Sequence, residues 1–449
     1  MDDIVLPPKL LSHLSKAAEI VRSHDFIQVY SHYDADGISA ASIIAKTLMR
    51  EGKEFRITLF TSLNDPNMKV ISDTQSECIV ISDLGASYIK QLDELSCDVV
   101  VLDHHTVEHQ AERICYANPH LYGIDGMTSG CGATMAFLFS ITMNEKNWDL
   151  VQIAFAGIAG DRQHIDGVKG LNEYLLKTGK KKGFIQIMEG SLIPPGDLGS
   201  ELLLSTDPYI AGVSGNPEGV SKLLNDAKID KGKDYRDLTA DEKRKLSSII
   251  ALKLVEQGTT LQTMNELART RYYLPNWKID AETFASLLNG CGRLGLGGVG
   301  VSAAIGDASS MEEAKDLNDT SKKQIMNGVL ELSSSTITAM KNIQWFDSST
   351  LGFTGMICGI AMQFIGDPSK PVFGVNHSEE LAKVSGRGTW EQLDKGVDLS
   401  IALKRACESV GGNGGGHKIA SGGSFPSLRL DEFLNNLNNI IGEQIRSSK

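Results

Sequence analysis

Four apolar segments in the first part of the chain end in, or run directly into, acidic residues and histidines. We expect all four segments to be strands, because short apolar runs bounded by polar residues are typical of buried strands. The segments are residues 26–31, 77–85, 97–105 and 151–164. The polar residues at their ends are His32, Asp34, Asp36, Asp83, Asp103, His104, His105 and Asp161. This recurring pattern restricts the folds that the chain can adopt.

Predicted helices lie between these strands and indicate the fold class. Residues 38–53, 87–95 and 129–143 have helical patterns, and residues 54–60 add a further strand. Strands that alternate with helices and are apolar on both faces indicate an α/β fold with a parallel sheet. In such a sheet the ligand crevice lies at the carboxyl ends of the strands. We therefore expect the polar residues to meet at one edge of the sheet.

The remaining sequence predicts a second, smaller domain. Residues 190–285 are turn-rich and partly helical, and residues 289–307 are predicted as a glycine-rich loop that leads into small-residue structure. A long, mostly polar helix follows, as is often found between two lobes. The predicted organisation is a large parallel-sheet domain at residues 1–308, a connecting helix at 309–342 and a small α/β domain at 343–449.

The composition limits the class of protein. Of the 449 residues, 41% are hydrophobic, which is enough to bury a core. The net charge of -12 argues against broad, non-specific binding of nucleic acid, although a local basic groove remains compatible with it. The seven cysteines include no C-x-x-C pair, so we expect reduced, buried thiols rather than a zinc ribbon. The N-terminal stretch "MDDIVLPPKLLSHL" lacks signal-peptide order, which predicts a soluble, cytoplasmic protein.

Carboxylates crowded at one edge of a sheet require a counter-charge. They repel one another and raise each other's pKa, and a bound cation removes this cost. Aspartate oxygens combined with a few imidazoles suit Mn²⁺ or Mg²⁺, and the imidazoles favour Mn²⁺. A carboxylate shared by two ions would make a two-metal site, which can activate water and hold the oxygens of a phosphoryl displacement.

Each motif taken alone has another interpretation. An Asp-x-Asp pair after a strand is often a helix cap or a turn, and His32 could bond to backbone at the strand end. A His-His pair often lies on the surface or in the core. Arg293, in the glycine-rich stretch, could contact phosphate or link the two domains. The recurrence of the same chemistry at four separate segments favours the metal site.

Together the motifs resemble those of the DHH phosphoesterase superfamily. "SHYDADGISAAS", "ISDLG", "VLDHH" and "GIAGD" are similar, in this order, to its four motifs. "GGNGGGHKIASGGSF" is similar to the glycine-rich motif of the C-terminal DHH-associated domain. "NGCGRLG" and the long helix resemble the RecJ-like exonuclease branch, especially its archaeal, GINS-associated members. The resemblance covers almost the whole chain and implies a DHH domain at 1–308 and a substrate-binding DHH-associated domain at 343–449.

The resemblance implies a role for each residue of the first domain. One ion would be held by His32, Asp34 and Asp83, and the other by Asp36, Asp83, His104 and Asp161. His105 would lie beside the scissile phosphate, and Asp103 would orient the histidines. The motif departs from several branches in one respect, since His32 stands two residues before Asp34 rather than four. Archaeal relatives resemble this shorter form.

The resemblance also implies a phosphate site in the second domain. Arg387 and His417 would contact substrate phosphate, and the planar guanidinium of arginine matches the geometry of phosphate. The backbone amides of Gly414, Gly415 and Gly416 would allow close approach of the strand.

The implied activity is a two-metal-dependent exonuclease on single-stranded DNA or RNA, in replication, repair or RNA processing. Three alternatives remain. A phosphodiesterase for short oligonucleotides or cyclic dinucleotides is disfavoured by the middle segment and the "GRLG" element. A GINS-binding replication scaffold is compatible with retained activity, although the full set of acidic ligands argues against an inert protein. Inorganic pyrophosphatases share the metal motifs but have a shorter C-terminal domain without a GG-x-GGGH element. The implied partners are single-stranded nucleic acid and, as further candidates, GINS or other replisome proteins.

Overall fold

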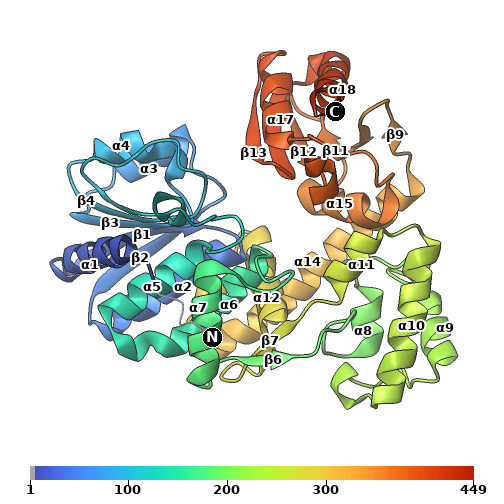
Figure 1. The fold of residues 1–449 in the computed structure, drawn as a ribbon, viewed down its shortest axis with the longest axis horizontal. Coiled ribbons are helices and arrows are strands. Elements are labelled where there is room, and N and C mark those ends of the chain that lie inside the picture. The colour runs from blue at the N-terminus through green and yellow to red at the C-terminus, as the bar shows by residue number, and fades with distance from the viewer. Residues whose placement is uncertain (1–5, 449) are drawn as a thin grey trace. The chain divides into compact units, whose positions relative to one another are not determined.

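The structure is a computed structural model that describes residues 6–448. The first five residues, which form part of the stretch used for the signal-peptide prediction, lie outside the described residues. The chain divides into two compact units (Figure 1). The first unit comprises the residues up to Gly190 and Arg269–Ser321, and the second comprises Ser191–Ala268 and the residues from Lys322 onward.

A five-stranded parallel sheet forms the centre of the first unit, as the sequence predicts. Its strand order is β2-β1-β3-β4-β5, and each pairing is parallel. Ser82 pairs with both Ser31 and Leu102, so the three central strands end at the same edge. The strands are β1 (Phe26–His32), β2 (Glu54–Phe60), β3 (Cys78–Ser82), β4 (Asp98–Leu102) and β5 (Cys115–Ala117).

Helices cover both faces of this sheet, which explains why its strands are apolar on both sides. Successive strand residues point to opposite faces, so Ile79 and Ile81 pack in one apolar cluster and Val80 in another. The helices on the side of Ile79 are α3 (Asp65–Ser72) and α4 (Ile89–Asp93). Those on the side of Val80 are α1 (Pro8–Arg22), α2 (Ala35–Arg50) and α5 (Gly132–Met143).

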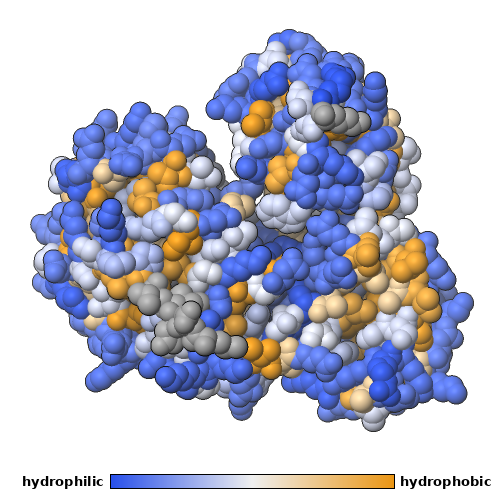
Figure 2. Space-filling model, viewed as in Figure 1, coloured by the Kyte–Doolittle hydropathy of each residue, from blue (hydrophilic) through white to orange (hydrophobic). Residues whose placement is uncertain are grey.

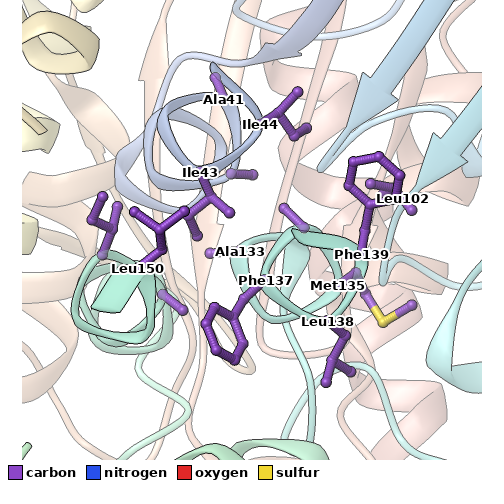
Figure 3. Close-up of a cluster of buried hydrophobic side chains, with 14 of the residues drawn as sticks. Ala41, Ile43, Ile44, Leu102, Ala133, Met135, Phe137, Leu138, Phe139 and Leu150 are labelled. Carbon is purple, nitrogen blue, oxygen red and sulfur yellow. The ribbon is translucent and has the colours of Figure 1, made fainter. Parts of the chain in front are cut away.

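The apolar core of the first unit includes the space between α2 and α5. Figure 3 shows Ile43 and Ile44 of α2 in one cluster with Phe137 and Leu138 of α5. Phe137 is fully buried, and its ring meets that of Trp148 edge to face, with 5.1 Å between the centroids. Because α5 is apolar on all sides, it is buried as a whole rather than along one face.

The fourth predicted strand is wrong, because Val151–Gly160 form helix α6. This helix packs against α2, α5 and α12 (Ala281–Arg293), and it is buried along its length. A fully buried apolar segment has no polar face, so its pattern does not distinguish a helix from a strand. A Cβ on Gly157 would lie 2.4 Å from the Ala133 Cβ, so glycine is what permits the close contact with α5. Asp161 therefore follows a helix.

The loop predicted at the start of residues 289–307 is wrong, because the stretch is mostly helical. The C-terminal part of α12 and helix α13 (Gly297–Ile305) span most of it, separated by a turn in which Gly295 has a φ of +74°. A Cβ on Gly292 would lie 1.8 Å from the Tyr33 carbonyl oxygen. At this position glycine permits close packing of α12 on the turn after β1, and the stretch does not form a flexible loop.

The first unit also contains α7 and a small antiparallel sheet, and the second unit begins with four helices. These elements are α7 (Gly170–Lys181), β6 (Gln186–Met188), β7 (Arg271–Leu274), β8 (Ile279–Asp280), α8 (Leu198–Leu203), α9 (Pro217–Ala227), α10 (Ala240–Glu256) and α11 (Leu261–Leu267). Apolar side chains are exposed over α10 and α11, where Leu252 and Leu261 are 63% and 77% accessible (Figure 2). Within the described residues, no helix has both the length and the apolar character to cross a membrane.

A six-stranded mixed sheet forms the C-terminal part of the second unit. Its order is β13-β14-β12-β11-β10-β9. The strands are β9 (Thr338–Ala339), β10 (Gln344–Asp347), β11 (Val372–Asn376), β12 (Leu381–Arg387), β13 (Asn413–His417) and β14 (Ala420–Pro426). The helices are α15 (Thr354–Ile360), α16 (Trp390–Asp394), α17 (Leu399–Glu408) and α18 (Leu430–Ser447). The predicted long helix is α14 (Ala308–Ser334), which begins in the first unit and ends in the second.

The compact units differ from the predicted domain limits. Residues 191–268 group with the C-terminal sheet, because Leu254 of α10 shares an apolar cluster with Val329 of α14 and Ile357 of α15. The limits 1–308, 309–342 and 343–449 therefore stay a proposal about domain organisation.

The packing of α5 yields a prediction about stability. We expect Phe137→Ala to lower the free energy of unfolding of the first unit by ~3–5 kcal/mol, because it removes a buried ring and leaves a cavity. Met49→Ala, at a half-exposed position of α2, should change it by less than ~0.5 kcal/mol. Chemical denaturation followed by circular dichroism measures both, and equal effects of the two substitutions would contradict the central position of Phe137.

Candidate metal centre

The first acidic motif spans the turn from β1 to α2. Asp34 is the N-cap of α2, and its Oδ1 accepts a hydrogen bond from the Gly37 backbone N–H at 3.0 Å. A Cβ on Gly37 would lie 2.3 Å from the His32 carbonyl oxygen, so the turn requires glycine there. The second oxygen of Asp34, Oδ2, lies 3.0 Å from His32 Nδ1. One carboxylate thus caps the helix and also reaches the site.

Asp36 is buried at the N-terminus of a second helix, α5. Its Oδ2 and Oδ1 accept hydrogen bonds from the backbone N–H groups of Gly132 and Ala133, at 2.7 and 2.9 Å. Unpaired N–H groups and the helix dipole stabilise negative charge at this end of a helix. A Cβ on Gly132 would lie 2.5 Å from the Asp83 Cβ, so glycine permits the two carboxylates to approach.

Asp83 follows β3 and lies between two histidines. Its φ of +55° is a left-handed conformation that is uncommon outside glycine and is concentrated at functional sites. Its Oδ2 lies 3.5 Å from His32 Nδ1, and its Oδ1 lies 3.1 Å from His104 Nε2. The two oxygens of this buried carboxylate therefore face different sets of side chains.

Asp103 is fully buried after β4 and orients the two histidines that follow it. Its Oδ1 accepts hydrogen bonds from the His104 backbone N–H at 2.7 Å and from His105 Nδ1 at 2.8 Å. His104 Nδ1 lies 2.8 Å from the Gly126 carbonyl oxygen. A carbonyl oxygen accepts only, so Nδ1 carries a proton and Nε2 of His104 is directed to the site.

Asp161 completes the cluster from the C-terminal end of α6. Its Oδ2 lies 3.4 Å from His104 Nε2, and Asp36 Oδ2 lies 3.8 Å from the same nitrogen. Three sets of side chains offer ligand atoms within 4.8 Å of one another. The sets are His32, Asp34 and Asp83; Asp36, His104 and Asp161; and Asp83, Asp103, His104 and His105. The structure thus brings together all eight candidate residues of the first unit.

His32 makes both the backbone contact and the contact with the acidic cluster that its sequence position suggested. Its Nε2 lies 3.3 Å from the Thr61 carbonyl oxygen, while its Nδ1 faces the carboxylates of Asp34 and Asp83. The backbone contact fixes the ring, and the other nitrogen points to the cluster. The short spacing between His32 and Asp34 is therefore compatible with a place in the centre.

The carboxylates of the cluster have strongly shifted pKa values. Burial raises the pKa of Asp36 well above its usual value, and the charges of Asp83 and Asp161 raise it further. Burial also raises the pKa of Asp161, to about 6, against the opposing effect of His104. Burial acts on Asp83 in the same direction, but hydrogen bonds from His104 and His32 hold its pKa well below the usual range.

The histidines carry the compensating charge. Burial acts to lower the pKa of His32 and of His104, yet the carboxylates beside each ring raise it well above the usual value. Without a metal ion, the protonated rings thus supply positive charge within the cluster. Carboxylate and imidazole ligands together suit Mn²⁺, with Mg²⁺ as the alternative, so the donor set fits a divalent cation.

Some residues of the centre lie outside the four motifs. The side-chain oxygen of Asn289 accepts a hydrogen bond from the Ala35 backbone N–H at 3.0 Å. Burial lowers the pKa of Arg293, and the charges of Tyr33 and Asp34 oppose this effect. Both residues belong to the "NGCGRLG" stretch of the sequence, but only Arg293 was considered there as a site residue.

The predicted phosphate-binding residues lie in the second unit, on the C-terminal sheet. Arg387 of β12 and His417 of β13 both pair with Ala420 of β14. Residues directly opposite in antiparallel strands share a face, so Arg387 and His417 lie on the same face of this sheet.

The three predicted glycines of β13 differ in their surroundings. A Cβ on Gly414 would lie 2.8 Å from the Leu403 carbonyl oxygen, so Gly414 packs closely on α17. Gly415 has open space at that position, and Gly416 has a φ of +133°. Packing thus accounts for Gly414, whereas the backbone at Gly415 is open to close approach.

Comparisons with known proteins agree with this architecture. The description "DHH family, N-terminal domain" matches residues 26–158, and "DHHA1 domain" matches residues 352–443. Protein MJ0831 of Methanocaldococcus jannaschii is 30% identical over 98% of this chain and 99% of its own length. YorK of Bacillus subtilis, named as a single-strand DNA-specific exonuclease, is 26% identical over 196 residues, which are 37% of this chain and 32% of YorK.

Two solved structures show the same fold at low sequence identity. RecJ from Thermus thermophilus, in complex with Mn²⁺, has a TM-score of 0.61 at 17% identity, with 98% of this chain and 56% of that chain covered. CDC45 from Entamoeba histolytica has a TM-score of 0.66 at 11% identity, with 96% of this chain and 99% of that chain covered. This chain therefore spans little more than half of that RecJ chain.

The protein has the RecJ-like fold. Its parallel sheet carries an acidic, histidine-containing centre at the carboxyl edge, and a long helix connects this sheet to a small mixed sheet. The chain belongs to the DHH family and carries a C-terminal DHHA1 domain.

The shifted pKa values predict how Mn²⁺ affinity depends on pH. His32, His104 and Asp36 have raised pKa values and must lose protons before they bind a cation. We expect Mn²⁺ affinity to rise as the pH rises above about 6.5, by about tenfold per pH unit for each proton released. Isothermal titration calorimetry in buffers of different ionisation enthalpy measures the protons released, and an affinity independent of pH would contradict the assignment.

Proposed function

We propose that the protein is a two-metal-dependent exonuclease that hydrolyses phosphodiester bonds of single-stranded DNA or RNA, in DNA replication, DNA repair or RNA processing. The observation that carries the proposal is the Asp83 carboxylate, which faces His32 with one oxygen and His104 with the other. A carboxylate shared between two sets of ligands is suited to a pair of divalent ions.

The residues that would hold the ions, preferably Mn²⁺, are His32, Asp34, Asp36, Asp83, His104 and Asp161. When bound, such a pair supplies Lewis-acid stabilisation of the phosphoryl oxygens and a lowered pKa of water. Asp103 would support the ligands, because its Oδ1 binds the His104 backbone N–H and the His105 ring while its Oδ2 accepts from the Ala86 backbone N–H at 2.7 Å.

His105 is suited to contact the substrate phosphate. Its Nδ1 lies 2.8 Å from Asp103 Oδ1, which fixes the ring next to His104 and Asp83. Burial acts to lower the pKa of His105, but the Asp103 carboxylate raises it above the usual value. A protonated ring can donate to a phosphoryl oxygen and stabilise the negative charge that develops in the transition state.

In the C-terminal domain we assign substrate binding to Arg387, His417 and the glycines 414–416. The shared face of Arg387 and His417 offers a guanidinium and an imidazole to one phosphate group. The similarity to YorK and the fold shared with RecJ support the proposed nuclease activity.

Substitution of Asp83, the shared carboxylate, tests the proposed nuclease activity directly. We expect Asp83→Asn to reduce cleavage of single-stranded DNA in Mn²⁺ by more than about 100-fold, because residues that merely support metal ligands already cost about 10- to 100-fold. Asparagine tolerates the left-handed backbone of this position, so the fold should persist. The measurement is the initial rate on an end-labelled strand, together with a circular dichroism spectrum.

Asp149→Asn is the matched control for this substitution. Asp149 forms an ion pair with Arg50 at 2.6 Å, away from the cluster, so its rate should equal that of the wild type. Wild-type rates for Asp83→Asn would remove Asp83 from the centre and with it the two-metal proposal.

The length of the substrate separates the proposal from the small-phosphodiester alternative. We expect a long single strand to be cut at least about tenfold faster than a two-nucleotide RNA at equal concentration, because contacts beyond the reacting phosphate add binding energy. Labelling either end of DNA and of RNA strands also reveals the direction of cleavage and the preference for DNA or RNA. Faster cleavage of the two-nucleotide RNA, or of a cyclic dinucleotide, would favour the alternative.

A scaffold function is a second candidate, and an observation on the second unit favours it. Exposed Leu252, Val255 and Leu261 gather on α10 and α11 (Figure 2), and large exposed apolar patches often mark protein interfaces. The candidate partner is the GINS complex or another replisome protein. A pull-down with Leu252→Ser and Leu261→Ser, beside the nuclease assay, distinguishes this function from catalysis and from a protein that performs both.

A further inference from the structure

We propose that Gln163 is a positioning residue that fixes two candidate metal ligands, His104 and Asp161, and connects them to the helix terminus that holds Asp36. Gln163 lies two residues after Asp161 and is 5% exposed. It stands outside the four motifs of the sequence. The inference rests on the proposed function, because it assigns a role within the same centre.

The carboxamide of Gln163 uses each of its hydrogen-bonding positions. Its Oε1 accepts from the Gly130 backbone N–H at 3.0 Å and from Asn172 Nδ2 at 2.8 Å. Its Nε2 donates to the Gly126 carbonyl oxygen at 2.8 Å and lies 3.4 Å from Asp161 Oδ2. A carboxamide has two donors and two acceptor positions. The two N–H groups that bind Oε1 therefore fix the orientation of the amide and direct its NH₂ group to the centre.

The Gly126 carbonyl links Gln163 to His104. This oxygen accepts from His104 Nδ1 at 2.8 Å and from Gln163 Nε2 at 2.8 Å. The acceptor keeps the proton on Nδ1, and the partner of the non-ligating nitrogen sets the orientation of a metal-binding imidazole. A Cβ on Gly126 would lie 2.1 Å from the His104 carbonyl oxygen, so the backbone can approach this closely only with glycine.

A second branch of the network leads toward Asp36. The side-chain oxygen of Asn172 accepts from Thr134 Oγ1 at 2.6 Å. Thr134 lies in the first turn of α5, directly after the Gly132 and Ala133 N–H groups that bind Asp36. A buried polar network in which each group is satisfied is rigid. Gln163 thus connects three candidate ligands that come from different parts of the chain.

A purely structural role is the competing explanation. A buried glutamine that satisfies Gly130 and Gly126 would stabilise the loop between β5 and α5 without any effect on ion binding. Both explanations predict lower stability when the side chain is removed. Only the positioning role predicts that the affinity for Mn²⁺ falls as well.

Gln152 is a matched control within the same unit. It lies in α6, is fully buried, and bonds to the backbone through both ends of its carboxamide. Its Nε2 donates to the Asp149 carbonyl oxygen at 3.4 Å, and its Oε1 accepts from the Asn276 N–H at 3.0 Å. Removing this side chain should lower stability without reaching the centre.

The experiment compares Gln163→Met with Gln152→Met in the full-length protein. Mn²⁺ binding is titrated without substrate by electron paramagnetic resonance, and Tm is measured without metal. We expect Gln163→Met to weaken Mn²⁺ binding about 10- to 100-fold, as found for residues that support metal ligands. We expect Gln152→Met to lower Tm by a similar amount and to retain the wild-type affinity. Equal Mn²⁺ affinities of the two variants would overturn the inference.

Alanine variants keep the test decisive if Gln163→Met does not fold. The polar cavity left by Gln163→Ala can hold water bonded to Gly130 and Gly126, which preserves the loop but not the orientation of Asp161. We expect Gln163→Ala to bind Mn²⁺ about 10- to 100-fold more weakly than Gln152→Ala. No Mn²⁺ binding by the wild type would overturn the proposed function, whereas equal binding by the wild type and Gln163→Ala would overturn this inference alone.

Discussion

Repulsion among the closely spaced carboxylates of Asp36, Asp83 and Asp161 is the constraint on which the rest of the centre depends. Asp36 and Asp83 are almost completely buried, and the pKa of Asp161, whose side chain is 22% exposed, is raised to about 6. Isolated buried charges cost several kcal/mol, so each must be compensated. The fold compensates Asp36 with the N-terminus of α5 and Asp83 with two imidazoles. A cation and a protonated histidine are thus alternative sources of the same positive charge, which is why ion binding and proton release are coupled.

Close approach of backbone elements is the second requirement, and glycines supply it. Gly132 lets α5 meet Asp83, Gly157 lets α6 meet Asp36, and Gly292 lets α12 meet the turn after β1. In each case a Cβ would fall within about 2.5 Å of another atom, so even alanine would displace the helix. The small-residue content of these helices therefore reflects the construction of the centre as well as helix packing.

Local patterns predicted the parts of the fold that local interactions determine. The ends of β1, β3 and β4 were predictable, because an apolar run followed by acids and histidines marks a strand that delivers polar groups to an edge. The helix before Asp161 was not, because a segment buried on all sides shows neither helical nor strand periodicity. Gln163 could not be found either, since its bond to Gly126 spans 37 residues of sequence. The grouping of residues 191–268 with the C-terminal sheet could not be predicted for the same reason, because α10 packs with helices far later in the chain.

Structural and functional interpretations of one residue are not exclusive here. Asp34 caps α2 with Oδ1 and faces His32 with Oδ2. His32 contacts the Thr61 backbone with one nitrogen and the carboxylates with the other, and His104 divides its nitrogens between Gly126 and Asp83 in the same way. A side chain with two polar atoms can be fixed by the fold through one atom while the other remains directed to a ligand. The helix-cap interpretation of the first motif was therefore correct and did not count against a metal site, since capping is what holds Asp34 in the centre.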